Sequence, residues 1–134
     1  MKNIKDKIYE RLSEKFGEES VSDQYPHDWG NLPRVQLTEE DNRVMEFTDE
    51  GETKSYVRYR IDIWHDRNTS PATALVDRAI GSPIMAARED GDHPLGLKRT
   101  SCADVPDPSG MKHKVMRYEG IIDMENDDAI YFAN

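Results

Sequence analysis

The stretch YVRYRIDIWH, residues 56–65, alternates in side-chain character with a period of two along its whole length. Successive side chains of a strand point to opposite faces of a sheet, so this pattern predicts a strand. Its predicted core face carries Val57, Tyr59, Ile61 and Ile63. The other face would carry Tyr56, Arg58, Arg60, Asp62 and Trp64. Because Tyr, Trp and Arg are enriched in interfaces, this second face is a candidate subunit contact; an ordinary exposed face fits its composition equally well.

Before this strand the sequence predicts a helix, a loop and two short strands. Apolar residues recur every four positions from Ile4 to Phe16, which predicts an amphipathic helix over residues 4–16 that Gly17 ends. Prolines and glycine between residues 18 and 33 indicate a loop. Two short strands are predicted at Arg34–Glu39 and Asn42–Thr48, with a turn at residues 49–52.

After residue 65 the sequence predicts a second helix and a hairpin. Ser70-Pro71 is typical of a helix start, with Ser as the N-cap. Gly81-Ser82-Pro83 should break this helix, and residues 89–94 should form a loop. Leu97–Ala103 and a strand from Lys112 onward should pair, because residues 107–110, DPSG, match a type I turn. A last short strand is predicted at Ala129–Phe132.

This order of elements predicts an α+β fold. We expect a mainly antiparallel sheet of four to five strands with two helices, the second one broken, packed on one face. A length of 134 residues suits a single domain, residues 1–134.

The composition argues against two kinds of partner. The chain has 18 Lys and Arg against 27 Asp and Glu, a formal charge of −9, and no basic stripe, so it is a poor candidate for specific nucleic-acid binding. It has no apolar run long enough to span a membrane, and its first residues lack a signal segment. We therefore expect no membrane partner and a site of synthesis and use in a cytoplasm.

Reactive side chains do not form a recognisable site in the sequence. The four histidines lie in different elements and the single cysteine, Cys102, stands alone, so we expect no metal site. Cys102 and His113 face each other across the predicted hairpin, but a nucleophile also needs a third, orienting group. We expect these two residues to be structural neighbours without a reactive role, and the chain not to be an enzyme.

Several short motifs resemble the tail terminator (tail completion) proteins of phages that infect Gram-positive bacteria. Tyr25-Pro26, Trp29, Leu32-Pro33 and Val35 are similar to the opening of that family, and residues 59–64 to its central strand. Residues 95–101, LGLKRTS, an Asp-Pro turn, and residues 113–120 carry the most specific part. The resemblance covers residues 25–122. The sequence departs from the family where Gly81-Ser82-Pro83 and residues 89–94 interrupt the second helix.

The resemblance implies a structural virion protein at the head–tail junction, assembled in the host cytoplasm. Members of the family form a ring, commonly a hexamer, that ends tube polymerisation and docks to the head connector. Its partners would be other copies of itself, the tail tube protein and a connector or stopper protein. It implies no cofactor and no catalytic residue. Another connector ring, of the stopper type, is the alternative, followed by an unrelated cytoplasmic enzyme or binding module.

Passage of DNA through such a ring predicts an acidic channel, since a basic one would bind phosphate. DNA would be a passenger without specific binding. The candidate lining residues belong to two acidic turns: Asp49, Glu50, Glu52, Asp123, Glu125, Asp127 and Asp128. Arg58 and Arg60 are expected in subunit contacts instead, where opposite charges give register.

Overall fold

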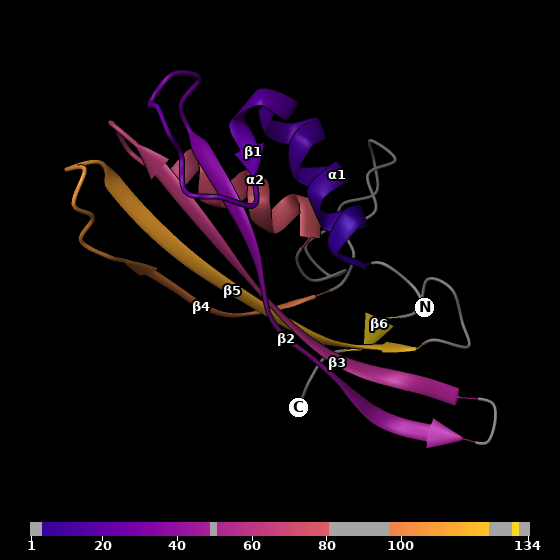
Figure 1. Cartoon of the computed structure of the whole chain (residues 1–134). Helices are drawn as coiled ribbons and strands as arrows, with labels where there is room; N and C mark the ends of the chain where they lie inside the picture. The colour runs from indigo at the N-terminus through magenta and orange to yellow at the C-terminus, as the bar shows by residue number, and fades with distance from the viewer. Residues whose placement is uncertain (1–3, 49–50, 81–96, 124–129, 132–134) are drawn as a thin grey trace.

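A computed structural model describes residues 4–48, 51–80, 97–123 and 130–131. The chain forms one sheet with two helices, α1 (Ile4–Phe16) and α2 (Ser70–Ile80), on one side (Figure 1). Five strands follow the order β1-β2-β3-β5-β4, and β6 pairs with β5. Their bounds are Val21–Ser22, Arg34–Thr48, Gly51–His65, Lys98–Asp104, Lys112–Asp123 and Ile130–Tyr131 for β1 to β6. All pairs are antiparallel except β1 with β2, so the predicted α+β class is confirmed.

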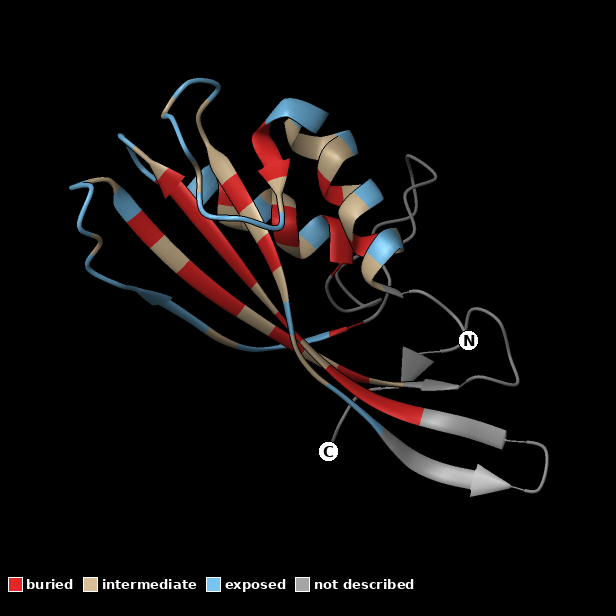
Figure 2. Ribbon diagram, viewed as in Figure 1, coloured by how far each residue is buried: buried red, intermediate tan, exposed pale blue. Residues whose placement is uncertain are grey.

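Strand β3 lies at the centre of the sheet because its inner face is apolar throughout. Val57, Tyr59, Ile61 and Ile63 are at most 1% exposed, as their alternation predicts. They pack with the buried residues of both helices and with β2 and β5 in one core. Figure 2 shows this buried layer between the sheet and the helices. Removing these apolar side chains from water is the main force that holds the helices on the sheet.

The two helices bury the stripes that their spacing predicts. Helix α1 has the predicted bounds, buries Ile8 and Leu12, and ends where Gly17 adopts a φ of +93°. Helix α2 begins at Ser70, one residue earlier than predicted, so that the Thr69 carbonyl accepts the Thr73 amide hydrogen bond. Both helices therefore cover one face of the sheet, and the opposite face is left to loops and polar side chains.

The strands of the first half differ from the prediction in three places. Residues 34–48 form the single strand β2, with a register shift between Glu39 and Asp41 where two strands were expected. Strand β3 begins at Gly51, so the expected turn is much shorter than residues 49–52. The two-residue strand β1 lies inside the expected loop and pairs in parallel with β2.

The hairpin of β4 and β5 forms around the predicted turn. The Gly110 amide donates to the Asp107 carbonyl at 3.0 Å, and Gly110 has a φ of +80° that suits glycine. The predicted break at residues 81–83 and the predicted loop at 89–94 lie outside the described residues.

Candidate functional site: an arginine cluster beside an aromatic end

The face of β3 opposite the helices carries the five residues predicted as a subunit contact. Trp64, Asp62 and Tyr56 are buried within the single chain, at 1%, 3% and 7% exposed. The side chains of Arg58 and Arg60 remain 40% and 35% exposed. Trp64, Asp62 and Tyr56 are thus already covered by the same chain, whereas Arg58 and Arg60 remain accessible. A subunit contact through this face stays a prediction for all five residues.

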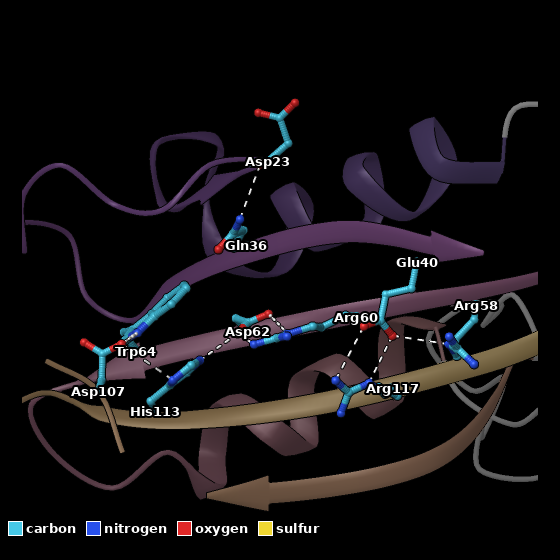
Figure 3. Close-up of polar contacts among 10 residues, drawn as sticks. All are labelled: Asp23, Gln36, Glu40, Arg58, Arg60, Asp62, Trp64, Asp107, His113 and Arg117. Atoms are coloured by element: carbon cyan, nitrogen blue, oxygen red, sulfur yellow. Dashed lines mark hydrogen bonds and ion pairs between the residues drawn. The ribbon is translucent and has the colours of Figure 1, made fainter. Parts of the chain in front are cut away.

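Three arginines gather on this face and form what we call the arginine cluster: Arg58, Arg60 and Arg117 (Figure 3). Arg117 donates from Nε to Glu40 at 3.0 Å, and Arg58 Nε lies 3.4 Å from the same carboxylate. Arg60 binds Asp62 with two hydrogen bonds of 2.8 and 2.9 Å, which raise the pKa of its guanidinium. These carboxylates hold the arginines in fixed positions while more than a third of each arginine side chain stays exposed.

The carboxylates also offset a repulsion that the sheet register creates. Arg60 and Arg117 lie directly opposite each other on β3 and β5. Like charges in such a pair destabilise a sheet, and each arginine here has its own carboxylate, Asp62 or Glu40. The cluster thus concentrates positive charge at one place on a chain whose formal charge is −9.

One end of the same face holds the aromatic end: Tyr25, Trp29, Trp64 and His113. The Trp64 ring stacks on His113 at 4.6 Å between centroids and meets the edge of Tyr25 at 5.3 Å. Tyr25 also packs edge-on against Trp29 at 5.8 Å. Tyr25 and Trp29 belong to the loop between β1 and β2. This loop buries Trp64 through aromatic contacts of favourable geometry.

Asp107 of the β4–β5 turn ties the aromatic end together. Its carboxylate accepts hydrogen bonds from Trp64 Nε1 at 3.1 Å, from the Tyr25 hydroxyl at 2.9 Å and from the Ser109 amide at 3.0 Å. Burial alone would raise the pKa of Asp107, but the hydrogen bonds from Ser109, Trp64 and Tyr25 outweigh it and lower the pKa to about 2. One ionised side chain therefore joins two loops and a strand.

Acidification should weaken the aromatic end through Asp107. Because the folded pKa lies below the usual value near 4, ionised Asp107 stabilises the fold above that value, and this contribution is lost as the pH falls from about 4 toward 2. We expect Asp107→Asn to lower the free energy of unfolding at pH 7 by about 2 kcal/mol and to reduce its change between pH 4 and 2. Urea unfolding at stepped pH measures both. Ser109→Ala, which removes the Ser109 hydroxyl that also donates to Asp107 and keeps the amide, should give a smaller change. An Asp107→Asn protein with the wild-type pH dependence would contradict this role.

His113 connects the aromatic end to the arginine cluster. Its Nε2 lies 2.7 Å from Asp62, which in turn binds Arg60. Its Nδ1 lies 3.7 Å from Asp107, too far for a hydrogen bond, and has no partner among the described residues. Stacking, the Asp62 contact and burial together give His113 a structural place in this face.

The expected pairing of Cys102 with His113 is wrong. Cys102 lies opposite Met116 in the β4–β5 register, whereas the β3 partner of His113 is Trp64. The length of the turn sets this register, because the shift between Arg99 and Ser101 comes only after Cys102, counted from the turn. Cys102 is also exposed. The pair that sequence reasoning weighed for catalysis is thus not assembled.

Among the described residues, no three side chains of His, Cys, Asp or Glu form a group that could hold a metal ion. In the same part of the chain, neither helix has the length and apolarity to cross a membrane.

Two of the predicted channel-lining residues, Glu52 and Asp123, lie at strand ends far from the aromatic end. Glu52 is the second residue of β3, and Asp123 ends β5, opposite Lys54. The sheet register therefore brings the strand ends that lead to both acidic turns to the same end of the molecule. Asp49, Glu50, Glu125, Asp127 and Asp128 lie outside the described residues. Channel lining stays a prediction for all seven.

Comparison with known proteins adds a likeness of fold. No protein-family model matches the chain, and no curated protein matches it. The chain is similar to a chain in the solved virion of a native gene transfer agent (GTA) particle. The TM-score is 0.50 at 16% identity, over 84% of this chain and 88% of that one. The two chains thus share an architecture over most of their lengths.

Sequence reasoning missed Glu40, Asp107 and Arg117 as parts of this face. Alternation along residues 112–122 does place Arg117 on the face opposite Met116 and Tyr118, so that signal was available. Glu40 sits at the register shift of β2, where the alternation fails. The turn alone accounts for an aspartate at position 107. The hydrogen bonds that it accepts from Trp64 and Tyr25 are visible only in the folded chain.

Proposed function

We propose that this chain is a structural virion protein that forms a ring at the head-proximal end of a phage tail tube. The ring, commonly a hexamer in the family that the chain resembles, ends tube polymerisation and joins the tail to the head connector. Its place is the virion and its role is not enzymatic. Its partners are other copies of the chain, the tail tube protein and a connector or stopper protein.

The likeness to a chain of a GTA virion carries this proposal. It extends over 84% of the chain, so it is not limited to one common motif. It is independent of the short motifs between residues 25 and 122 that resemble tail terminators. Components of a virus particle and tail terminators both act by assembling with other protein subunits.

The arginine cluster is the surface best suited to the contact between copies. Both edges of the sheet are short or irregular: β1 has only two residues beside β2, whose pairing with β3 is shifted, and β4 has a register shift against β5. Irregular edges oppose the addition of a further strand, which disfavours joining copies into a continuous sheet. The cluster instead offers prepositioned, half-exposed arginines, and arginine is a residue that interface hot spots favour.

Replacing the exposed arginines should prevent ring formation. We expect Arg58→Ala with Arg60→Ala to weaken association of copies by about 2 kcal/mol or more. A smaller loss of stability should accompany it, because Asp62 then keeps only His113 as a partner. Light scattering and electron microscopy of the purified protein, alone and with tail tubes, measure the association. The matched control, Lys5→Ala with Arg78→Ala, removes the same charge from the helices on the other side and should assemble normally. A wild-type protein that stays monomeric and does not bind tubes would refute the proposed function itself.

The acidic turns are the proposed channel lining in such a ring. Six copies would carry 6 × −9 = −54 formal charges, and an acidic wall lets DNA pass without binding. The lining residues proposed are Asp49, Glu50, Glu52, Asp123, Glu125, Asp127 and Asp128. A stopper-type connector ring is the second candidate, because a likeness to a virion chain does not fix the position of the ring along the particle. Tube binding separates the two candidates.

A further inference from the structure

We propose that the aromatic end is a docking surface for a lysine- or arginine-bearing segment of another protein of the particle. This inference rests on the proposed function for the source of that segment. It concerns a different surface from the arginine cluster, which serves contacts between copies.

Exposed apolar side chains point to this end of the molecule. Among the described residues, the large hydrophobic side chains that stand out as exposed are Tyr25, at 47%, and Val105, at 38%. Both lie in loops that meet at Asp107. The Asp107 carboxylate accepts a hydrogen bond from the Tyr25 hydroxyl, and Val105 lies two residues before Asp107 in the chain. The adjoining Pro106 and Pro108 are also exposed. Gathered rather than scattered exposed apolar groups are typical of an interaction site.

The exposed ring of Tyr25 is held in place before any partner binds. Its hydroxyl is bonded to Asp107 and its ring is fixed between Trp29 and Trp64. Trp64 is itself buried and bonded to the same carboxylate. A side chain that is already ordered loses little entropy on binding, which is what makes rigid aromatic residues effective contacts.

The charge of the two loops selects the partner. Residues 22–33 and 104–111 contain four aspartates, Asp23, Asp28, Asp104 and Asp107, and no lysine or arginine. Arg34 and Lys114 on the strands pair with Asp28 and Asp104, so the surface stays negative by about two charges. An aromatic ring attracts a cation over its face, and the ionised Asp107 that accepts a hydrogen bond from the Tyr25 hydroxyl adds to this attraction. The chain itself contains this kind of contact, with Arg43 placed 4.6 Å above the ring of Tyr56.

A second copy is the less suitable occupant of this surface. Two aromatic ends brought together would place about four net negative charges against each other, and the chain as a whole is acidic. A basic segment of a different protein has no such repulsion to overcome. We therefore assign the aromatic end to a contact that leaves the ring, rather than one within it.

The test uses two matched peptides, acetyl-Gly-Arg-Leu-Arg-Gly-amide and the same peptide with glutamate in place of arginine. Both tryptophans of the chain belong to the aromatic end, so tryptophan emission reports on it directly. We expect the arginine peptide to change the emission saturably and to shift the amide resonances of Tyr25, Trp29 and Val105. Tyr25→Ala should weaken binding about fivefold, and added salt should weaken it further. The glutamate peptide should give neither effect.

A second variant guards against loss of the loop structure in Tyr25→Ala. Asp23→Lys keeps every aromatic ring and should weaken the arginine peptide while improving the glutamate peptide. Equal responses to both peptides, or resonance shifts confined to the arginine cluster, would overturn the inference. So would a Tyr25→Ala protein that no longer forms rings, since the surface would then lie between copies. The protein with both Arg58→Ala and Arg60→Ala should lose ring formation and still bind the arginine peptide. This result would show that the two surfaces act separately.

Discussion

Trp64→Ala should lower the free energy of unfolding by about 3–5 kcal/mol, the largest loss that we expect from a single substitution in this chain. The side chain is 1% exposed, stacks on His113, touches Tyr25 and donates to Asp107. Its removal leaves a cavity between the sheet and the loop of residues 22–33. Since domains of this size are stable by only about 5–15 kcal/mol, the variant should melt far below the wild type. Urea unfolding followed by circular dichroism measures the loss.

Two further substitutions show which contact of Trp64 matters. Trp64→Phe keeps a ring on His113 and loses the bond to Asp107, so it should cost clearly less than Trp64→Ala. Trp29→Ala removes a partly exposed ring from the same cluster and should also cost less. If Trp64→Ala unfolds at wild-type urea concentrations but blocks assembly, Trp64 acts at a subunit contact and its burial in the single chain does not decide its role.

Asp62→Ala should lower the free energy of unfolding by about 2–3 kcal/mol. The carboxylate is 3% exposed and accepts hydrogen bonds from Arg60 and from His113 Nε2. Without it, the His113 ring keeps no hydrogen-bond partner among the described residues, while Arg60 can turn toward water. The cost is therefore less than that of a fully buried ion pair broken on one side.

The amide variant separates the charge of Asp62 from its shape. Asp62→Asn retains an oxygen that can accept from either neighbour, and we expect it to recover about half of the loss. It should also restore the position of Arg60, so ring formation should return with stability. An Asp62→Ala protein as stable as the wild type would show that the contacts of Asp62 with Arg60 and His113 contribute nothing to the fold.

The sequence predicts those parts of the fold that have a local period. Helix α1 and the inner face of β3 are clear because each apolar stripe repeats without interruption. Strand β1 has two residues and no period, so it is indistinguishable from a loop. Strand β2 looks like two strands because residues 39–41, EED, resemble a turn, whereas they accommodate a register shift within one strand.

The candidate site is less predictable because its contacts join distant parts of the chain. Alternation places Trp64 on the polar face correctly, but its burial depends on Tyr25, 39 residues earlier, and Asp107, 43 residues later. No local pattern contains that information. The arginines were identified from residue type alone, and their carboxylate partners depend on strand order. Glu40 reaches Arg117 across β3, over a separation of 77 residues.

The central position of β3 has a consequence for the order in which the chain can fold. Tyr59 of β3 pairs with Glu39 of β2 at a separation of 20 residues, but with Tyr118 of β5 at a separation of 118 − 59 = 59. The hairpin of β2 and β3 can therefore close while the chain is still being synthesised, whereas the other edge of β3 has to wait for the last quarter of the sequence. Until then, an open edge and an apolar face remain accessible to any neighbouring nascent chain, which is the usual starting point of aggregation. The chain is thus most vulnerable in the interval between the emergence of β3 and the arrival of β5.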